Sequence, residues 1–242
     1  MTAADTAPPP TAKASVWEDF IDIYYAPSQV FERRRDGRFG LALLVITIVL
    51  SLLFWLSQTY LEPMYTAEMN RQIAAAMRDN PQMTQEMADQ MRGFQRFGVI
   101  FSIIVIPIVA MLTGFVLWLV GKLFDSTQTL GQALMVGTYA QFPRVFDWIV
   151  RNVQGAVLSP EAIEPKYGVS LSLARFLDRE AVSPVMYELA GRLDLFTLWV
   201  TALLAIGLHV TGAVPKARAY IAAGIVWLIG ALPMVLGALR EG

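Results

Sequence analysis

The chain has 242 residues, of which 55% are hydrophobic and only 16% are charged, and its formal net charge at pH 7 is -1. This composition is too apolar for an ordinary soluble domain of that length and predicts a membrane protein. The near-neutral charge excludes a basic nucleic-acid binder. The lack of cysteine excludes a disulfide framework, a thiolate metal site and a cysteine nucleophile.

The N-terminal part is predicted to contain a tail and a surface helix. Residues 1–14 are rich in Ala, Pro and Thr without apolar periodicity, which indicates a disordered tail. Residues 15–37 are predicted to form a cytoplasmic interfacial amphipathic segment, which begins with a capping box of Ser15 and Glu18. Its aromatic face holds Trp17, Phe20, Ile21 and Tyr24, and its opposite face holds Glu18, Asp19 and Asp22. Because anionic lipid repels these acids, we expect the helix to dock at the cytoplasmic mouth of a helix bundle.

A second short helix is predicted to start at Pro27 and to continue the apolar stripe through Val30 and Phe31. It ends in three arginines, which we expect to meet a helix C-terminus and lipid phosphates: Arg33, Arg34 and Arg35. The pattern favours a structural interfacial anchor over a specific partner site, because amphipathic interfacial helices need no partner to be explained.

Residues 38–242 are predicted to form an all-α polytopic membrane bundle of five transmembrane helices. At ~1.5 Å per residue, the uncharged run 39–61 reaches ~35 Å, which is enough to cross a hydrocarbon core of about 30 Å. The five predicted spans are residues 39–61, 97–121, 130–150, 195–215 and 219–239. Since arginines precede the first span directly, we expect a cytoplasmic N-terminus and an extracytoplasmic C-terminus.

Two long loops are predicted to lie outside the membrane and to be helical. Residues 62–96 carry two methionine-rich stripes at helical spacing, and Ser183-Pro184 is typical of a helix start in the second loop. A thioether site for Cu(I) is the alternative interpretation of the methionines. Packing of amphipathic helices is favoured, because the nearby sequence has no Cys or His and thioethers alone bind weakly. We therefore expect no metal.

Catalytic and cofactor motifs are absent from the sequence. It contains no G-x-G-x-x-G, G-K-[ST], H-E-x-x-H or G-x-S-x-G pattern, so we expect neither enzymatic activity nor a cofactor. The one histidine, His209, is predicted to be a hydrogen-bonding residue near the inner end of the fourth span. A proton relay is the alternative, but it would need a chain of ionisable groups.

The third predicted span is the most polar one. Arg144, Asp147 and Arg151 fall on one helical face at i, i+3 and i+7, and Gln141 precedes them. Counted from Leu130, Arg144 lies ~21 Å and Asp147 ~26 Å along the axis, which approaches the outer edge of the core. This depth favours an ion-paired structural latch. A substrate or ion pathway remains the alternative, since buried charges in spans are commonly functional.

Several short motifs, in this order, resemble the Yip1 family, particularly its bacterial branch, from about Ser15 to the C-terminus. They are Asp22-Ile23-Tyr24-Tyr25-Ala26-Pro27, Val30-Phe31, Gly137-Thr138-Tyr139-Ala140-Gln141-Phe142-Pro143, Asp194-Leu195-Phe196-Thr197-Leu198-Trp199, Ala205-Ile206-Gly207-Leu208 and Lys216-Ala217-Arg218-Ala219. The resemblance implies a five-helix bundle with a cytoplasmic N-terminus, in a bacterial inner membrane. It also implies architectural roles for Tyr24, Pro27, Tyr139 and Pro143, with Pro143 opening the helix backbone and Tyr139 bonding a freed carbonyl.

Two hypotheses for function follow. Eukaryotic members of the family bind prenylated small GTPases and take part in vesicle traffic, but this chain has an extra residue between Tyr24 and Pro27 and a short tail. The favoured hypothesis is a non-enzymatic membrane scaffold or adaptor in membrane organisation or protein trafficking. Its partners would be the lipid bilayer and an unidentified membrane or cytoplasmic protein, with homo-oligomerisation left open and no nucleic acid. The alternative is a small permease or channel that uses the polar third span.

Overall fold

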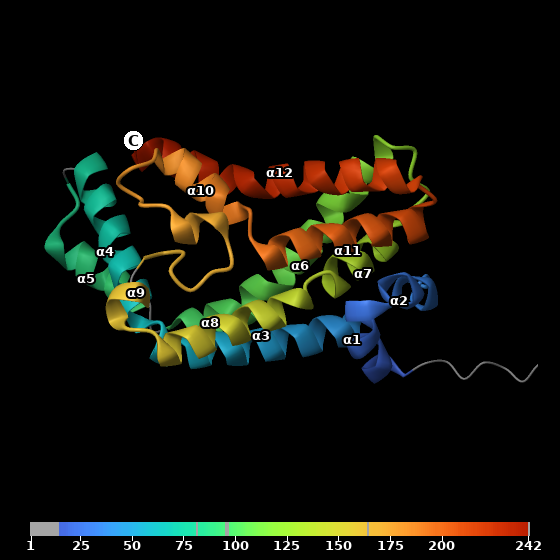
Figure 1. Cartoon of the computed structure of the whole chain (residues 1–242), viewed down its shortest axis with the longest axis horizontal. Helices are drawn as coiled ribbons and strands as arrows, with labels where there is room; N and C mark the ends of the chain where they lie inside the picture. The colour runs from blue at the N-terminus through green and yellow to red at the C-terminus, as the bar shows by residue number, and fades with distance from the viewer. Residues whose placement is uncertain (1–14, 81, 95–96, 164, 242) are drawn as a thin grey trace, which may run out of the picture.

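The computed structural model describes residues 15–80, 82–94, 97–163 and 165–241. Within these ranges the chain is all-α, as the sequence predicts, and an isolated bridge pairs Ser172 with Asp194. The predicted disordered tail, residues 1–14, lies outside them. Figure 1 shows the elements, which in chain order are α1 Val16–Tyr25, α2 Pro27–Arg33, α3 Gly40–Tyr60, α4 Glu62–Asp79, α5 Gln85–Phe94, α6 Gly98–Lys122, α7 Leu130–Tyr139, α8 Pro143–Val157, α9 Pro160–Ile163, the 3₁₀ helix η2 Leu173–Phe176, α10 Pro184–Arg192, α11 Leu195–Gly212 and α12 Lys216–Glu241.

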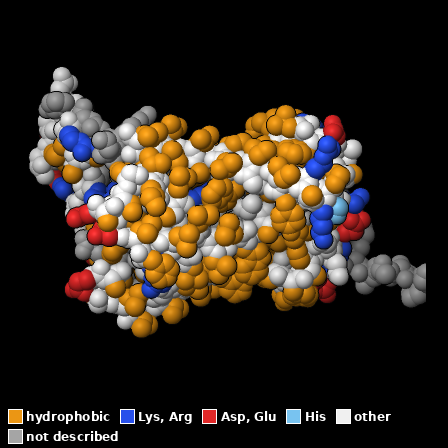
Figure 2. Space-filling model, turned by 45° about the horizontal axis from the view of Figure 1, so that its top comes forward, with side chains coloured by type: hydrophobic (Ala, Val, Ile, Leu, Met, Phe, Trp, Pro, Cys, Tyr) orange, Lys and Arg blue, Asp and Glu red, His pale blue; other side chains and the backbone are white. Residues whose placement is uncertain are grey.

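Among the described residues, four helices are long and apolar enough to cross a membrane: α3, α6, α11 and α12. Their outward faces expose large apolar side chains, for example Leu44, Ile104 and Leu228. Figure 2 shows hydrophobic side chains covering the middle of the bundle, with charged side chains gathered toward its two ends. A surface of this kind is stable only against lipid. The chain is therefore an integral membrane protein.

The third predicted span differs from the prediction. We expected one helix over residues 130–150, but the structure has two, α7 and α8, separated by a turn at residues 140–142. Pro143 explains the interruption, because proline has no N–H to donate to the preceding turn and its ring clashes with that turn. Each helix packs on a different neighbour, α7 on α6 and α8 on α3. Figure 1 shows α7 and α8 following one another along the bundle.

Small residues let α6 and α7 approach closely. A Cβ added to Gly137 would lie 2.5 Å from the backbone nitrogen of Gly114, and one added to Gly114 would lie 2.6 Å from the carbonyl oxygen of Ala133. Ala110 and Ala133 are fully buried beside them. The two helices thus meet through small residues at i, i+4 spacing, the arrangement that membrane helices use for close contact.

The two short connections at the arginine-rich end of the bundle are bonded to each other. The backbone N–H of Thr127 donates to the carbonyl of Gly212 over 3.0 Å, and the amide of Gln128 donates to the hydroxyl of Thr211 over 2.6 Å. His209 Nδ1 lies 2.7 Å from the carbonyl oxygen of Val214, so it is a hydrogen-bonding residue at the helix end, as predicted. These bonds join the α6–α7 turn to the α11–α12 turn.

The opposite end of the bundle carries two longer segments. In the first, α4 and α5 pack on each other with Ile73 and Ala88 buried, although Met87, which was expected in the packed stripe, is 47% exposed. In the second, α10 begins with Ser183 as its cap and lies against α12. At this end of the molecule, the hydroxyl of Tyr167 donates a hydrogen bond of 2.7 Å to the carboxylate of Glu188. Burial of the phenol is the main cause that raises the pKa of Tyr167, and its hydrogen bond to Glu188 is the second cause.

Candidate functional site

The candidate residues gather into two clusters, one at each side of the break between α7 and α8. We call the first the inner lock, defined by Asp19, Arg33, Arg34 and Tyr139. We call the second the outer polar cluster, defined by Arg144, Asp147, Arg151 and Asp194. Together they hold most of the polar side chains that the sequence singles out.

Asp19 is the centre of the inner lock. Its side chain is fully buried and pairs with Arg33 over 2.8 Å and with Arg34 over 2.5 Å. The hydroxyl of Tyr139 also points to this carboxylate, at 3.4 Å. The α1–α2 corner at Ala26 produces the arrangement, because it turns the two helices so that the acids of α1 face the arginines of α2. Burial of the negative charge of Asp19 is tolerated here because the positive charges of Arg33 and Arg34 lie beside it.

Asp22 extends the inner lock toward its exposed edge. Its carboxylate accepts a hydrogen bond from Tyr25 and one from Arg33, each over 2.5 Å. These two bonds, in that order, lower the pKa of Asp22 below its ordinary value. The capping box of Ser15 and Glu18 at the start of α1 is present, as predicted.

The orientation of α1 corrects the sequence interpretation. The acids were expected on a face turned away from the aromatic docking face, but Asp19 is buried while Trp17 and Ile21 are about two-thirds exposed. Of the predicted aromatic face, Phe20 and Tyr24 pack on the core. The carboxylate of Asp19 lies inside, where Arg33 and Arg34 neutralise its charge.

Arg33, Arg34 and Arg35 contact groups that differ from those predicted from the sequence. Arg33 and Arg34, expected at lipid phosphates, bind the carboxylates of α1. Arg35 does meet a helix C-terminus, but that of another helix: it donates to the carbonyl of Val210 in α11 over 2.6 Å. Its own carbonyl accepts from Gln132 in α7 over 2.9 Å. The arginine cluster is thus tied to the bundle rather than free at its surface.

Tyr24 performs the bonding role that we expected of Tyr139. The hydroxyl of Tyr24 donates to the carbonyl of Phe142, directly before Pro143, over 3.0 Å. Its ring packs edge-on against Phe146 and Trp199, and burial raises its pKa to about 12. The N-terminal motif residue therefore bonds the backbone at the break. Pro27 starts α2, and Phe31 is fully buried on the same helix.

The break itself is closed by the chain's own groups. Gln141 donates to the carbonyl of Gly137 over 3.2 Å and accepts from Arg144 over 2.9 Å. The backbone N–H groups of residues 141 and 142 bond to the carbonyls of Thr138 and Tyr139. Turn carbonyls that could have lined a polar passage are thus engaged by the protein.

In the outer polar cluster, Asp147 pairs with Arg151 over 2.6 Å, and both side chains are largely buried. Of the charges expected on one face, Arg144 bonds to Gln141 instead of Asp147. Asn152, one residue on, donates to the carbonyl of Leu53 over 3.1 Å and thereby ties α8 to α3. Arg144 thus bonds to the residue three positions before it, and Arg151 to the residue four positions before it. Asn152 bonds to a neighbouring helix.

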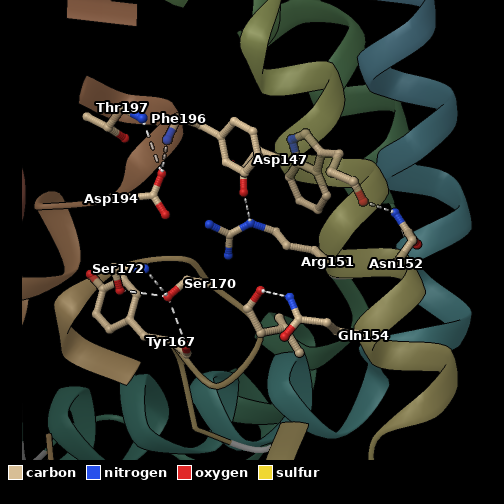
Figure 3. A network of polar contacts seen from close by, with 12 residues as sticks. Asp147, Arg151, Asn152, Gln154, Tyr167, Ser170, Ser172, Asp194, Phe196 and Thr197 are labelled. Atoms are coloured by element: carbon tan, nitrogen blue, oxygen red, sulfur yellow. Dashed lines mark hydrogen bonds and ion pairs between the residues drawn. The ribbon is translucent and has the colours of Figure 1, made fainter. Parts of the chain in front are cut away.

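Asp194 caps α11 from the other side of the outer polar cluster. One oxygen of its carboxylate accepts from the backbone N–H of Phe196 at 2.9 Å and of Thr197 at 3.2 Å. The second oxygen is buried and has no hydrogen-bond partner. Figure 3 shows the guanidinium of Arg151 reaching from α8 toward this carboxylate, with Ser170 and Ser172 nearby.

Asp19 and Arg192 are two charged residues that the sequence reasoning missed as parts of a site. Arg192 lies in α10 over the ring of Trp227 and donates to that residue's carbonyl over 3.4 Å. Burial, and next the positive charge of Arg144, lower the pKa of Arg192 to about 10. A charge two residues before the motif that starts at Asp194 was a usable signal for Arg192. For Asp19, the signal was an acid on the helix that precedes an arginine run.

The chemistry of both clusters is that of ion pairs and caps. In the described part of the chain, no group of three or more His, Cys, Asp or Glu side chains could hold a metal ion. Each carboxylate of the two clusters is instead engaged by guanidinium or backbone N–H groups. Such groups position helices.

The family model for the Yip1 domain matches residues 21–237. The chain belongs to the Yip1 family. No curated protein matches it. No solved structure matches it either.

Membership of the Yip1 family confirms the resemblance that the sequence motifs indicated. The structure shows where these motifs lie. The N-terminal motif supplies Asp22, Tyr24 and Pro27 to the inner lock and to the break, and the motif of the third span supplies Tyr139 and Pro143 to the same region. Asp194, the first residue of a later motif, caps α11. In this Yip1 protein, motifs far apart in sequence thus meet around one helix break.

Proposed function

We propose that this Yip1 protein is a non-enzymatic scaffold or adaptor of a bacterial plasma membrane, with a role in membrane organisation or protein trafficking. In this proposal α7 and α8 together form a discontinuous third crossing, which makes five crossings in all. The N-terminus is cytoplasmic and the C-terminus extracytoplasmic. Residues 15–37 form the cytoplasmic interfacial segment, and the methionine-rich loop faces the exterior.

The charge distribution supports this orientation. Arg33, Arg34, Arg35 and Arg38 lie directly before α3, and basic residues close to the first span usually decide orientation. The α6–α7 and α11–α12 turns, with Lys122, Lys216 and Arg218, lie at the same end as α1 and α2 (Figure 1). An odd number of crossings then puts the C-terminus on the other side.

The observation that carries the scaffold proposal is the closure of the helix break. A transporter that binds its substrate at a discontinuous helix leaves backbone groups free to coordinate it. Here Tyr24, Gln141 and the turn backbone engage those groups, and the inner lock fixes α1 and α2 over the same region. This bonding favours a rigid body that presents fixed surfaces over one that opens a path.

A small permease or channel is the second candidate. One specific observation favours it: the buried second oxygen of Asp194 lacks a partner while the guanidinium of Arg151 reaches toward it. Unsatisfied charged groups within a membrane are a common mark of an ion or substrate path.

Two experiments separate the candidates. The purified protein in liposomes loaded with labelled phosphate and Rb⁺ is expected to release neither faster than protein-free liposomes. Release that Asp147→Asn abolishes would overturn the scaffold proposal. In native membranes, a photo-crosslinking residue at Tyr25, which is 72% exposed beside the inner lock, is expected to capture one protein that also co-purifies with the intact chain. The matched control is the same residue at lipid-exposed Leu44, which is expected to capture lipid.

A further inference from the structure

An apolar groove lies between η2 and α10, and none of the residues that line it belongs to either cluster. Its volume is about 600 Å³ and its lining is apolar except for Ser183. The side chains that line it are Leu173, Phe176, Leu177, Val185, Met186, Leu189, Ala190 and Leu193. Three of them are largely exposed, Phe176 at 82% and Leu173 and Met186 each at 55%. Such a surface on an aqueous loop would be costly, since apolar area exposed to water is unfavourable at about 25 cal/mol per Å².

The contacts of α10 show how far along the bundle this groove lies. Arg192, at the end of α10, donates to the carbonyl of Trp227 and contacts α12 at Gly230. Met234 of the same helix packs on the cluster that includes Ala190. Counted from Lys216 at ~1.5 Å per residue, Trp227 lies ~16 Å and Met234 ~27 Å along α12. Both fall within a hydrocarbon core of about 30 Å, so α10 lies beside the membrane-crossing part of α12.

The groove is also continuous with the lipid-facing surface of the bundle. Leu193 belongs to the groove, and Leu195 and Leu198 carry the exposed apolar surface onward along α11. The groove thus joins the belt of exposed apolar side chains without an intervening charged residue on this path. Charged residues lie elsewhere on the same loop, where Asp178 and Glu180 are exposed.

We propose that lipid acyl chains of the leaflet remote from the arginine cluster fill this groove, so that η2 and α10 are a membrane-embedded part of the loop. The occupant follows from continuity with the lipid-facing surface and from the position of α10 beside the crossing part of α12. Arg192 then anchors the inner end of α10 through backbone and ring contacts instead of water. The proposal requires that α11 and α12 cross the membrane, but it does not depend on the scaffold function.

The absence of cysteine from the sequence makes a direct test practical. Single variants Phe176→Cys and Met186→Cys of the full chain are spin-labelled and placed in liposomes of phosphatidylethanolamine and phosphatidylglycerol. Accessibility to apolar O₂ is then compared with accessibility to a water-soluble nickel chelate. Leu228→Cys, on the exposed face of α12, is the lipid reference, and Glu180→Cys, on the same loop, is the aqueous reference.

The expected result is that labels at 176 and 186 have O₂-to-nickel accessibility ratios close to that of Leu228→Cys. Ratios close to that of Glu180→Cys would overturn the proposal. Labels accessible to neither reagent would also overturn it, and dipolar broadening between labels would then identify a second copy as the occupant. Size-exclusion profiles equal to that of the parent protein show that each variant is folded.

Discussion

The inner lock and the outer polar cluster are built from the same residue types but are satisfied to different degrees. In the inner lock, both oxygens of the buried carboxylate of Asp19 lie in ion pairs with guanidinium groups, although its Oδ1 makes no hydrogen bond. In the outer polar cluster, Asp147 has one arginine, and one oxygen of Asp194 has no partner. The inner lock therefore fixes one arrangement of the chain, whereas the outer polar cluster retains a carboxylate oxygen, on Asp194, that can accept a further bond.

The largest expected effect is at the inner lock. Asp19→Asn removes the shared anion and leaves two arginines in a poorly hydrated site, which we expect to lower the free energy of unfolding by about 3–5 kcal/mol. Thermal unfolding in detergent measures it. The matched control is Glu32→Gln, whose side chain is 60% exposed and pairs with Arg35; we expect a change of about 0–1 kcal/mol there. Equal effects of the two variants would contradict the inner lock.

A smaller effect is expected in the outer polar cluster. Asp147→Ala removes a single, largely buried bond to Arg151, and we expect a loss of about 2 kcal/mol, as for other hydrogen bonds to charged groups. The measurement is again the unfolding midpoint in detergent. An unchanged midpoint would rule out the latch interpretation and would strengthen the permease candidate.

Tyr24→Phe tests the bond that joins the N-terminal motif to the helix break. The variant keeps the ring contacts with Phe146 and Trp199 but removes the hydroxyl that donates to the carbonyl of Phe142, which also accepts from the backbone N–H of Val145. We expect a loss of about 1 kcal/mol in unfolding free energy. Tyr220→Phe is the control, because that tyrosine is 47% exposed on α12. Faster hydrogen exchange in α8 for Tyr24→Phe alone would confirm that the bond fixes the break.

The smallest effect is a pH dependence at the edge of the inner lock. Because the pKa of Asp22 is lower in the folded protein than its ordinary value of 3.8, its stabilising contribution is fully present above pH 3.8. The contribution is lost as the pH falls below that value through the folded pKa. The difference in unfolding midpoint between the parent protein and Asp22→Asn should therefore shrink below about pH 4. A difference that is constant with pH would contradict this assignment.

The sequence predicted the membrane class, the four apolar spans, the cap of α1, the start of α2 and the family. Each of these depends on a local signal, either a long uncharged run or a capping residue. It placed a helix over residues 130–150 but missed its division, although Pro143 was recognised as a backbone opener. The division depends on how the turn is bonded, and one of its donors, the hydroxyl of Tyr24, is 118 residues away from the carbonyl of Phe142 that it bonds.

The partners of the charged residues could not be predicted for a related reason. Helical spacing places Arg144 near both Asp147 and Gln141, and only packing selects the amide. Likewise, the pattern of α1 identified two faces but not which one would be buried, because burial of Asp19 depends on pairing with Arg33 and Arg34 after the chain turns at Ala26. Asp19 was therefore expected at the surface and is fully enclosed.

The long sequence separation within the inner lock has a consequence for biogenesis. Asp19 leaves the ribosome 120 residues before Tyr139, and Arg35 leaves it 175 residues before Val210. The first two helices can therefore make all of their final contacts only after α7 and α11 have been synthesised. Completion of α11 is thus the event that allows the start of the chain to dock, so translation order makes the N-terminus one of the last parts to reach its final position.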